Sequence, residues 1–475
     1  MNANNTHKYT KIDILPKDWK RFRLGDICEI IMGQSPSGHA VIASERSERG
    51  NPQKFTKTLT IDCHENSNGF SRNDKAVEFH QGKIYFTDKF LAKSDFVTTE
   101  PLKIAEPNSI LLCVRAPVGV VNFTQRKIAI GRGLCAIKAN KAHNEFIYFI
   151  LLSLKDYFET KSAGSTFSAI NSNEVKNVKI PLPPLAEQEK IAQILGVWDK
   201  GISILKSLIE AKTKRKKALM QRLLTPPTPL TPSAREGEQK SHHDTKAPPL
   251  AGGVGVGYSH IENNRNDDKV LDCHDLTASN LAMTEKNSKA KQSLRFAEFT
   301  DKWQEFRFND IFIRIPSKKY QIQTKEYQLN GKYPVIDQGQ TAIIGYSNNE
   351  SKVFKNSSVI VFGDHTRELK FIDFDFIVGA DGVQLLRTKD EFNDRFFYYQ
   401  LQIKKIPNTG YNRHFKFLLD MPFVCPTLTE QKKIAQVLSA CDKEIELLKS
   451  KFQCLKMQKR GLMQRLLNGK VRVKI

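Results

Sequence analysis

Residues 187–207 read "EQEKIAQILGVWDKGISILKS" and residues 430–450 read "EQKKIAQVLSACDKEIELLKS", so one stretch occurs twice, 243 residues apart. The match continues without a gap to "LMQRLL" at 219–224 and 462–467, with 20 identities in 38 positions. An internal repeat of this length is the strongest organising signal that a sequence can carry. The chain is therefore built from two copies of one unit.

Each copy of this stretch carries apolar residues at alternating steps of four and three, which is the period of a coiled coil. The spacing predicts two helices that meet along the following residues: Ile191, Leu195, Trp198, Ile202 and Leu205 in the first copy, and Ile434, Leu438, Ile445, Leu448 and Phe452 in the second. Two copies of one unit joined by a linker can close around a two-fold axis. We therefore expect the helices to pair antiparallel.

Lys216 and Lys459 interrupt the apolar seam at the same position of the repeat. A polar residue inside a seam lowers stability but fixes register and partner geometry, which is one interpretation of the pair. Lysines that extend from the seam into solvent are the other.

Prolines mark where both helices start, because proline is tolerated only before or within the first helical turn. They are Pro181, Pro183 and Pro184 in the first copy, and Pro422 and Pro426 in the second. Thirty-eight helical residues make a rod of about 57 Å, which suits a spacer.

The segments that precede the helices read as mixed structure with short strands rich in Val, Ile and Phe, as at 109–123 and 357–386. Helices are expected at 144–161 and 394–405. Upstream, "DWKRFRLGDI" from Asp18 is similar to "KWQEFRFNDI" from Lys302. The fold class is therefore α+β, with these expected parts: a first globular domain at 1–184, a first coiled-coil helix at 185–224, a flexible linker at 225–293, a second globular domain at 294–426, and a second helix with a C-terminal tail at 427–475.

The formal net charge of +23 favours a polyanionic partner such as nucleic acid. Neither a signal peptide nor an apolar run long enough to span a membrane is apparent, so we expect a cytoplasmic protein without membrane contact. Eight cysteines form no CxxC pair and no spacing suited to zinc, which predicts reduced, mostly buried thiols.

Motifs for catalysis are missing from the sequence: there is no phosphate-binding loop, no nucleophile elbow and no HExxH helix. Asp364 and His365, followed by Arg367, form the most suggestive group. A polar turn between strands is equally a place for contacts to bases and phosphates. We expect neither a catalytic site nor a cofactor nor a metal.

The string "GSTFSAINSNEVKNVKIPLPPLAEQEKIAQIL" at 164–195 resembles the junction between recognition domain and helix in specificity subunits of type I restriction-modification systems. "VFGDHTRELKFIDFDFIVGADGVQLL" at 361–386 resembles a segment inside many of their recognition domains. The second junction, "LLDMPFVCPTLTEQKKIA", departs from the family in lacking a run of prolines. The resemblance implies a non-catalytic subunit that binds double-stranded DNA, joins two modification subunits and sometimes restriction subunits, and reads a bipartite, asymmetric target.

Polar loops of the recognition domains are the expected places for DNA contacts, because basic and hydroxyl side chains suit phosphates and guanine edges. The candidates are Arg115, Lys127, Arg132, Ser165 and Thr166 in the first domain, and His365, Arg367, Arg413 and Lys416 in the second.

Three other classes of protein remain open at this point. A standalone DNA-binding protein would share the charge and the repeat, but no helix-turn-helix is evident. A coiled-coil scaffold would not need two strand-rich domains. A catalytic homologue would need a further domain.

The rod predicts a ruler for the unread gap between the two half-sites. Inserting four residues near Ala211 adds about 6 Å and keeps the seam nearly in phase. The methylated target should keep both half-sites while its gap lengthens by one or two base pairs, given about 34 Å per turn of DNA. Sequencing of methylated host DNA measures the gap. If methylation persists and the gap does not change, the helices do not set the spacing and serve only to dock the modification subunits.

Overall fold

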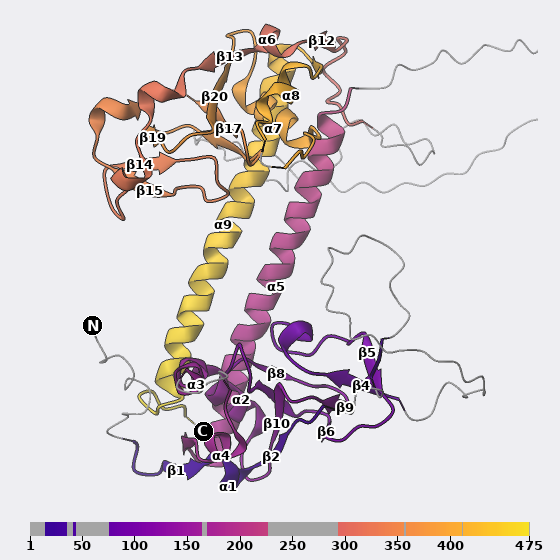
Figure 1. Cartoon of the computed structure of the whole chain (residues 1–475), viewed down its shortest axis with the longest axis vertical. Helices are drawn as coiled ribbons and strands as arrows, with labels where there is room; N and C mark the ends of the chain where they lie inside the picture. The colour runs from indigo at the N-terminus through magenta and orange to yellow at the C-terminus, as the bar shows by residue number, and fades with distance from the viewer. Residues whose placement is uncertain are drawn as a thin grey trace, which may run out of the picture. The chain divides into compact units, whose positions relative to one another are not determined.

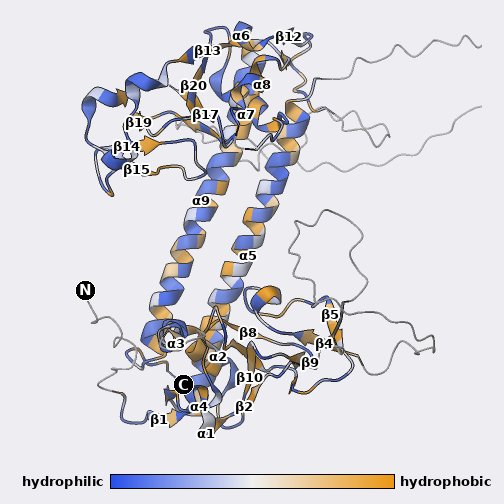
Figure 2. Ribbon diagram, viewed as in Figure 1, coloured by the Kyte–Doolittle hydropathy of each residue, from blue (hydrophilic) through white to orange (hydrophobic). Residues whose placement is uncertain are grey.

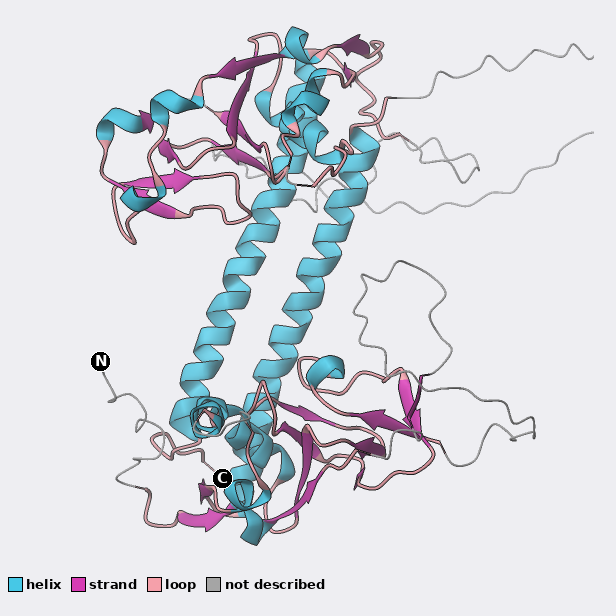
Figure 3. Cartoon of the chain, viewed as in Figure 1, coloured by secondary structure: helices cyan, strands magenta, loops and turns pink. Residues whose placement is uncertain are grey.

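The computed structural model describes seven stretches of the chain: 15–35, 41–43, 76–163, 169–226, 293–355, 358–410 and 412–474. The predicted linker at 225–293 lies outside the described residues except at its two ends. The chain divides into two compact units, which are residues 1–208 with 449–475 and residues 209–448. Each unit combines sheets with a part of both long helices (Figures 1 and 3).

The described residues of unit 1 form three sheets. A four-stranded antiparallel sheet has the order β2 (Cys28–Met32), β10 (Leu134–Ala139), β7 (Ile110–Cys113), β8 (Val121–Phe123). A five-stranded sheet has the order β3 (Val41–Ala43), β5 (Phe96–Thr98), β4 (Val77–His80), β9 (Ile128–Ile130), β6 (Ile104–Ala105). A third sheet pairs β1 (Lys20–Arg23) with β11 (Lys179–Leu182).

Unit 2 repeats this plan. Its first sheet has the order β13 (Phe312–Ile315), β20 (Val383–Thr388), β17 (Val359–Gly363), β18 (Leu369–Ile372). Its second has the order β15 (Gly345–Ser347), β14 (Tyr333–Ile336), β19 (Phe376–Val378), β16 (Val353–Phe354). Its third pairs β12 (Gln304–Phe306) with β21 (Phe423–Cys425). The repeat seen in the sequence is thus a repeat of the fold.

The central strands β7 and β17 are buried on both faces. Successive side chains of a strand point to opposite faces, so a strand between two layers must be apolar throughout. In β7, Ile110 and Leu112 join the core cluster that contains the helices, whereas Leu111 joins the cluster against the second sheet. In β17, Ile360 and Val361 divide in the same way.

Short helices cover the sheets: α1 (Leu24–Ile27), α2 (Asn144–Ser153), α3 (Lys155–Ser162) and α4 (Ser172–Lys176) in unit 1, and α6 (Phe308–Ile311), α7 (Asp394–Ile403) and α8 (Phe415–Leu419) in unit 2. The helix expected at 144–161 is wrong as a single helix, because it breaks at Leu154. There the hydroxyl of Ser153 donates to the Ile150 carbonyl at 2.7 Å, which competes with the helical ladder. The helix expected at 394–405 ends at Ile403.

The two long helices are α5 (Leu185–Leu223) and α9 (Leu428–Leu466). In unit 1, Ile191 and Leu195 near the start of α5 share a core cluster with Met463 and Leu466 near the end of α9. In unit 2, the end of α5 shares a cluster with the start of α9. Each unit therefore packs the beginning of one helix against the end of the other.

Ion pairs between the helices confirm the antiparallel direction within unit 2. Lys212 pairs with Glu444, and Lys216, one turn farther along α5, pairs with Asp442, which lies earlier in α9. Both nitrogen–oxygen distances are 2.5 Å. In unit 1, Lys459 of α9 pairs with Asp199 of α5.

The lysines that interrupt the seam are both paired and half-buried. Lys216 lies 5.1 Å from the ring centroid of Tyr399, whose hydroxyl donates to the Asp442 carboxylate at 2.7 Å. Lys459 lies 5.1 Å from the ring centroid of Phe149. Asp199 and Asp442 are 243 residues apart, as are the two lysines. The seam therefore carries one Lys–Asp–aromatic group in each unit, and neither lysine simply extends into solvent.

A buried Glu-Gln pair in the first turns of each long helix joins that helix to its domain. Gln188 accepts from the His143 backbone at 2.8 Å and donates to the Pro183 carbonyl at 2.8 Å. Gln431 accepts from Asn393 at 3.0 Å and donates to Pro426 at 2.8 Å. The amide thus holds the helix start against the segment that leads into α2 or α7.

The glutamates beside these glutamines are fully buried and paired with arginines. In unit 1, Arg472 donates to both oxygens of Glu187 at 2.7 and 2.8 Å. In unit 2, Arg295 donates to both oxygens of Glu430 at 2.9 and 2.8 Å. These contacts of the glutamate and the glutamine explain why both helices begin with the same Glu-Gln pair.

Four of the described cysteines are buried, and their thiols take no part in disulfides: Cys28, Cys113, Cys135 and Cys425. Burial raises the pKa of each to about 12. Cys63 and Cys273 lie outside the described residues. Within the part that the structure describes, every helix is too short or too polar to cross a bilayer.

We predict that Asp442→Ala lowers the unfolding temperature of the protein, because it strips Lys216 of its ion pair and the Tyr399 hydroxyl of its acceptor. Loss of hydrogen bonds to a charged group costs about 1–3 kcal/mol. The double variant Lys216→Met with Asp442→Ala should recover part of this loss, because no unpaired charge remains. Thermal unfolding of the three proteins measures both effects. Equal unfolding temperatures would show that the group does not stabilise the seam.

Candidate nucleic-acid interface

Three segments of unit 1 meet at Val114, in the turn that follows β7. The Val114 backbone N–H donates to the Gly133 carbonyl at 3.0 Å, in the turn between β9 and β10. The Ile170 N–H donates to the Val114 carbonyl at 3.0 Å, just before α4. Arg115 also forms a backbone bridge with Ala169. The register of the β7–β10 pair therefore places three segments next to one another: the turn after β7, the turn between β9 and β10, and the residues just before α4.

The corresponding segments of unit 2 meet in the same way at Asp364. Its N–H donates to the Gly382 carbonyl at 2.7 Å, and its own carbonyl accepts from the His414 N–H at 2.8 Å, just before α8. The backbone network of the two units is therefore the same. We call these two meeting points the junctions of unit 1 and of unit 2.

Most of the residues that the sequence singled out lie at these junctions. Arg115 and Arg132 are exposed on the two turns of the unit 1 junction. His365, Arg367 and Arg413 belong to the turn after β17 and to the approach to α8 in unit 2. Lys416 is exposed in the first turn of α8. Ser165 and Thr166 lie outside the described residues.

Lys127 lies away from the junction, in the turn between β8 and β9, and its ammonium is 3.7 Å from the Glu106 carboxylate. Its neighbour Arg126 is structural, because it donates to both oxygens of Glu78 at 2.5 Å. Burial raises the pKa of Glu78, but hydrogen bonds from Arg126, the Ser94 backbone and His80 outweigh it and lower the pKa to about 2.

The basic side chains at the junctions differ in how they are held. Within the described part of the chain, Arg115 and Arg132 have no ion-pair partner. Arg367 is half-buried and donates to the Ile406 carbonyl at 3.3 Å. Its φ of 64° lies in the left-handed region, where a side chain is strained. The turn of unit 1 has Gly119 at this point, with φ 83°.

Asp364 is a structural residue, and the geometry does not favour a catalytic pair with His365. Its carboxylate accepts from the Phe415 N–H at 2.8 Å and from the Gln384 amide at 3.4 Å. The carboxylate is therefore used to hold the start of α8 against β20. The His365 N–H donates to the Gln338 side chain at 3.2 Å.

Amide and acidic side chains at the unit 2 junction were missed by the sequence reading. Gln338 donates to the Asp381 carbonyl at 3.0 Å, and Gln321 donates to the Asp381 carboxylate at 2.9 Å. Gln321 and Asp381, together with Arg413 and Gln384, line a cavity of about 500 Å³. The one available signal was that Gln338 follows soon after a buried strand end.

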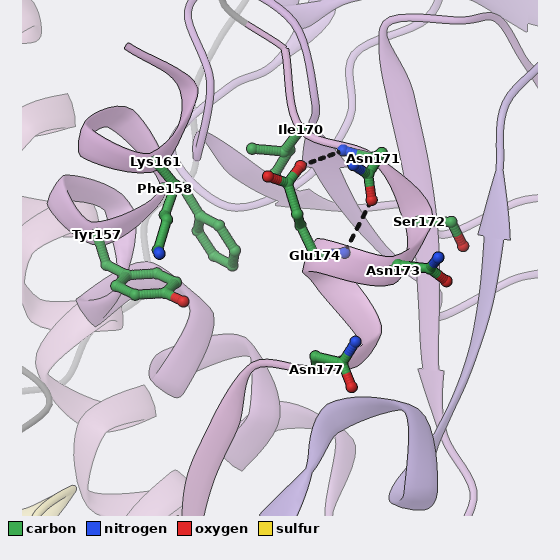
Figure 4. Close-up of a pocket in the computed structure, with 9 residues that line it drawn as sticks. All are labelled: Tyr157, Phe158, Lys161, Ile170, Asn171, Ser172, Asn173, Glu174 and Asn177. Carbon is green, nitrogen blue, oxygen red and sulfur yellow. Dashed lines mark hydrogen bonds between the residues drawn. The ribbon is translucent and has the colours of Figure 1, made fainter. Parts of the chain in front are cut away.

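A second cavity of about 500 Å³ lies between α3 and α4 in unit 1 (Figure 4). Asn171 and Glu174 line it and form a capping box, with Asn171 N–H to Glu174 Oε2 at 2.7 Å and Glu174 N–H to Asn171 Oδ1 at 3.0 Å. Tyr157 and Lys161 face it from α3 (Figure 4). The carboxylate is thus occupied in capping, and the cavity offers polar contacts without an acid–base arrangement.

Comparison with known proteins points to one family. The sequence matches the family described as "Type I restriction modification DNA specificity domain" over residues 16–213 and 300–457. A type I restriction enzyme specificity subunit of Methanocaldococcus jannaschii, MjaX, is 34% identical over 226 residues, which are 47% of this chain and 46% of that protein.

A second protein of that organism, the type I restriction enzyme MjaVIII specificity subunit, is 26% identical over 44% of this chain and 43% of its own. Each of these matches spans about half the length of the relative. The crystal structure of a type I restriction-modification system S subunit from M. genitalium superposes with a TM-score of 0.53 at 15% identity and covers 98% of both chains. That likeness concerns the fold.

Two substitutions at Arg367 distinguish the cost of its strained backbone from the contribution of its side chain to DNA binding. Glycine adopts a φ of 64° freely, so Arg367→Gly should relieve about 1 kcal/mol of strain that Arg367→Ala retains. If the side chain contacts DNA, both variants should lose about 1–3 kcal/mol of binding free energy. Thermal unfolding and titration with target duplex measure the two effects. Full binding by Arg367→Gly would show that only the shape of the turn matters.

Proposed function

The chain belongs to the family of type I restriction-modification DNA specificity domains, and from this premise we propose that it is the target-reading subunit of such a system. Each junction, with the loops around it, contacts one half of a bipartite, asymmetric site in double-stranded DNA. The long helices space the halves and bind modification subunits, two per chain, and in some systems restriction subunits join the assembly. The chain itself supplies no catalytic residue and needs no cofactor.

One observation carries this proposal: the same backbone network supports different side chains in the two units. Unit 1 presents Arg115 and Arg132, whereas unit 2 presents His365, Asp381 and Arg413 at the corresponding segments. Guanine favours arginine, and cytosine can donate to a carboxylate. Two domains with the same backbone network and different surface side chains suit an asymmetric target. The excess of positive charge suits contacts to phosphates.

Apolar side chains on the outer faces of the helices support a role in binding partners. Val197 and Ile204 of α5 are 67% and 70% exposed, and Leu447, which lies 243 residues after Ile204, is 71% exposed. None of them belongs to the seam. Figure 2 shows apolar and polar residues interspersed along both helices. Exposed aliphatic residues at helical spacing suit helices of a partner.

We predict that Ile204→Glu together with Leu447→Glu abolishes co-purification of the modification subunit, because each buries a charge in the proposed contact. Ser203→Glu, also exposed on α5, is the control and should leave the complex intact. Duplex binding by the isolated chain should not change in any of these variants. An intact complex in the double variant would contradict the proposed docking face.

Methylation of host DNA tests target reading directly. A host that expresses this chain with its modification subunit should methylate one bipartite, asymmetric sequence. Alanine at Arg115 and Arg132 should weaken methylation through one half-site, by about 1–3 kcal/mol per base contact. Alanine at Arg367 and Arg413 should affect the other half. Unchanged methylation in all of these variants would contradict the assignment of the junctions.

A further inference from the structure

A groove of about 920 Å³ opens in unit 1 beside the last turns of α9. Its other walls are the end of α2, the start of α3 and strands β1 and β11. Six basic residues line it: Arg21, Lys155, Lys179, Arg460, Arg465 and Lys470. Asp156 is the one acidic residue among the described residues that line the groove. It therefore has a strong positive charge.

The floor of this groove is apolar. It consists of side chains from the edge of the unit 1 core: Ile150, Leu154, Val178, Ile180, Met463 and Leu467. The basic residues are exposed around this floor. An apolar centre with a charged, solvent-accessible rim is the usual anatomy of a protein–protein contact.

Three of the six basic residues on the rim have no ion-pair partner among the described residues. Lys155 lies 3.3 Å from Glu159. In the described ranges, Lys179, Arg460 and Lys470 have no ion-pair partner. Like charges gathered around one groove repel each other, and this repulsion is relieved when an anionic group binds.

The corresponding place in unit 2 holds a lysine. The residue directly after α7 is Lys404, whose ammonium donates to the Pro422 carbonyl and lies 4.9 Å from the Phe423 ring centroid. Burial lowers its pKa, and the charge of Glu305 on β12 raises it. A lysine thus fills the position between α7 and β21, with an acidic residue nearby.

Both of these residues are replaced in unit 1. The residue directly after α2 is Leu154, and the residue of β1 that matches Glu305 in the repeat is Arg21. At these two positions, unit 1 therefore has an apolar residue where unit 2 has a lysine, and a basic residue where unit 2 has an acidic one. The two copies therefore differ in charge and polarity at this place.

We propose that this groove binds an acidic, amphipathic segment of a partner protein. The apolar side chains of that segment would cover the floor, and its carboxylates would pair with the rim. A DNA backbone is a charged sugar–phosphate chain without aliphatic side chains to cover the floor, so an amphipathic peptide fits better. The proposal goes beyond target reading and helix docking, because it gives the chain a partner site built on residues of unit 1 that differ in unit 2.

The sharpest test transplants the residues of unit 2 into unit 1. The full chain with Arg21→Glu and Leu154→Lys acquires the pair that unit 2 already contains, so its fold should persist. The probe is a fluorescent peptide of about 18 residues, or five helical turns, with leucines at helical spacing and glutamates elsewhere. A peptide with glutamine in place of glutamate is the neutral control.

We expect the acidic peptide to bind about tenfold more weakly to the transplanted variant than to the parent chain, by fluorescence anisotropy. Lys83→Gln, which makes the same net change of charge at an exposed site of unit 1, should leave its affinity within about twofold. Photo-crosslinks from the bound peptide should fall within 150–157, 177–181 or 460–470. Arg460→Glu is a second variant, in case the first unfolds.

Three results would overturn the proposal. Equal affinity of the parent chain and the folded variants would exclude the groove as the binding place. Equal affinity for the acidic and neutral peptides would exclude recognition of carboxylates. Competition by a duplex without the target, together with a loss of duplex binding in the same variants, would make the groove a DNA surface. None of these results concerns the target that the junctions read.

Discussion

The rest of the structure depends on a buried carboxylate in the first turn of each long helix. Glu187 and Glu430 are 0% and 1% exposed, and a buried charge is tolerated only when it is paired. Each must keep both oxygens on an arginine guanidinium, Arg472 or Arg295, and Trp19 donates to Glu187 as well. This pairing joins the first turn of each long helix to the segment that carries its arginine.

Duplication let the two halves keep this framework while their surfaces changed. The Glu-Gln pair, the Lys–Asp–aromatic group and the meeting of three segments at Val114 or Asp364 recur in both units. The side chains around them differ: Phe149 stands where Tyr399 does, and Gly119 where Arg367 does. Function varies most easily at positions that do not hold the frame, and the junction side chains are of that kind.

The sequence predicted the architecture well because the signals involved are local. A period of 3.5 residues and a preceding proline indicate a helix without knowledge of its partner, and both helices begin within two residues of the expected positions. The partners of the seam lysines could not be predicted, since they lie 226 and 260 residues away. The closeness of the turns that carry Arg115 and Arg132, and the role of Gln338, likewise depend on strand register, which composition does not contain.

Unit 1 is assembled from both ends of the sequence, because Met463, Leu466 and Leu467 belong to the same core as Trp19 and Ile147. A ribosome releases those three side chains more than 250 residues after it has released the last strand of the domain that they complete. During synthesis, the domain encoded first must therefore wait with an incomplete core while residues 209–448, which contain the whole of unit 2, are made. During translation, unit 2 can therefore complete its core before unit 1 does. Unit 1 completes its core only after residues 463–467 have been made.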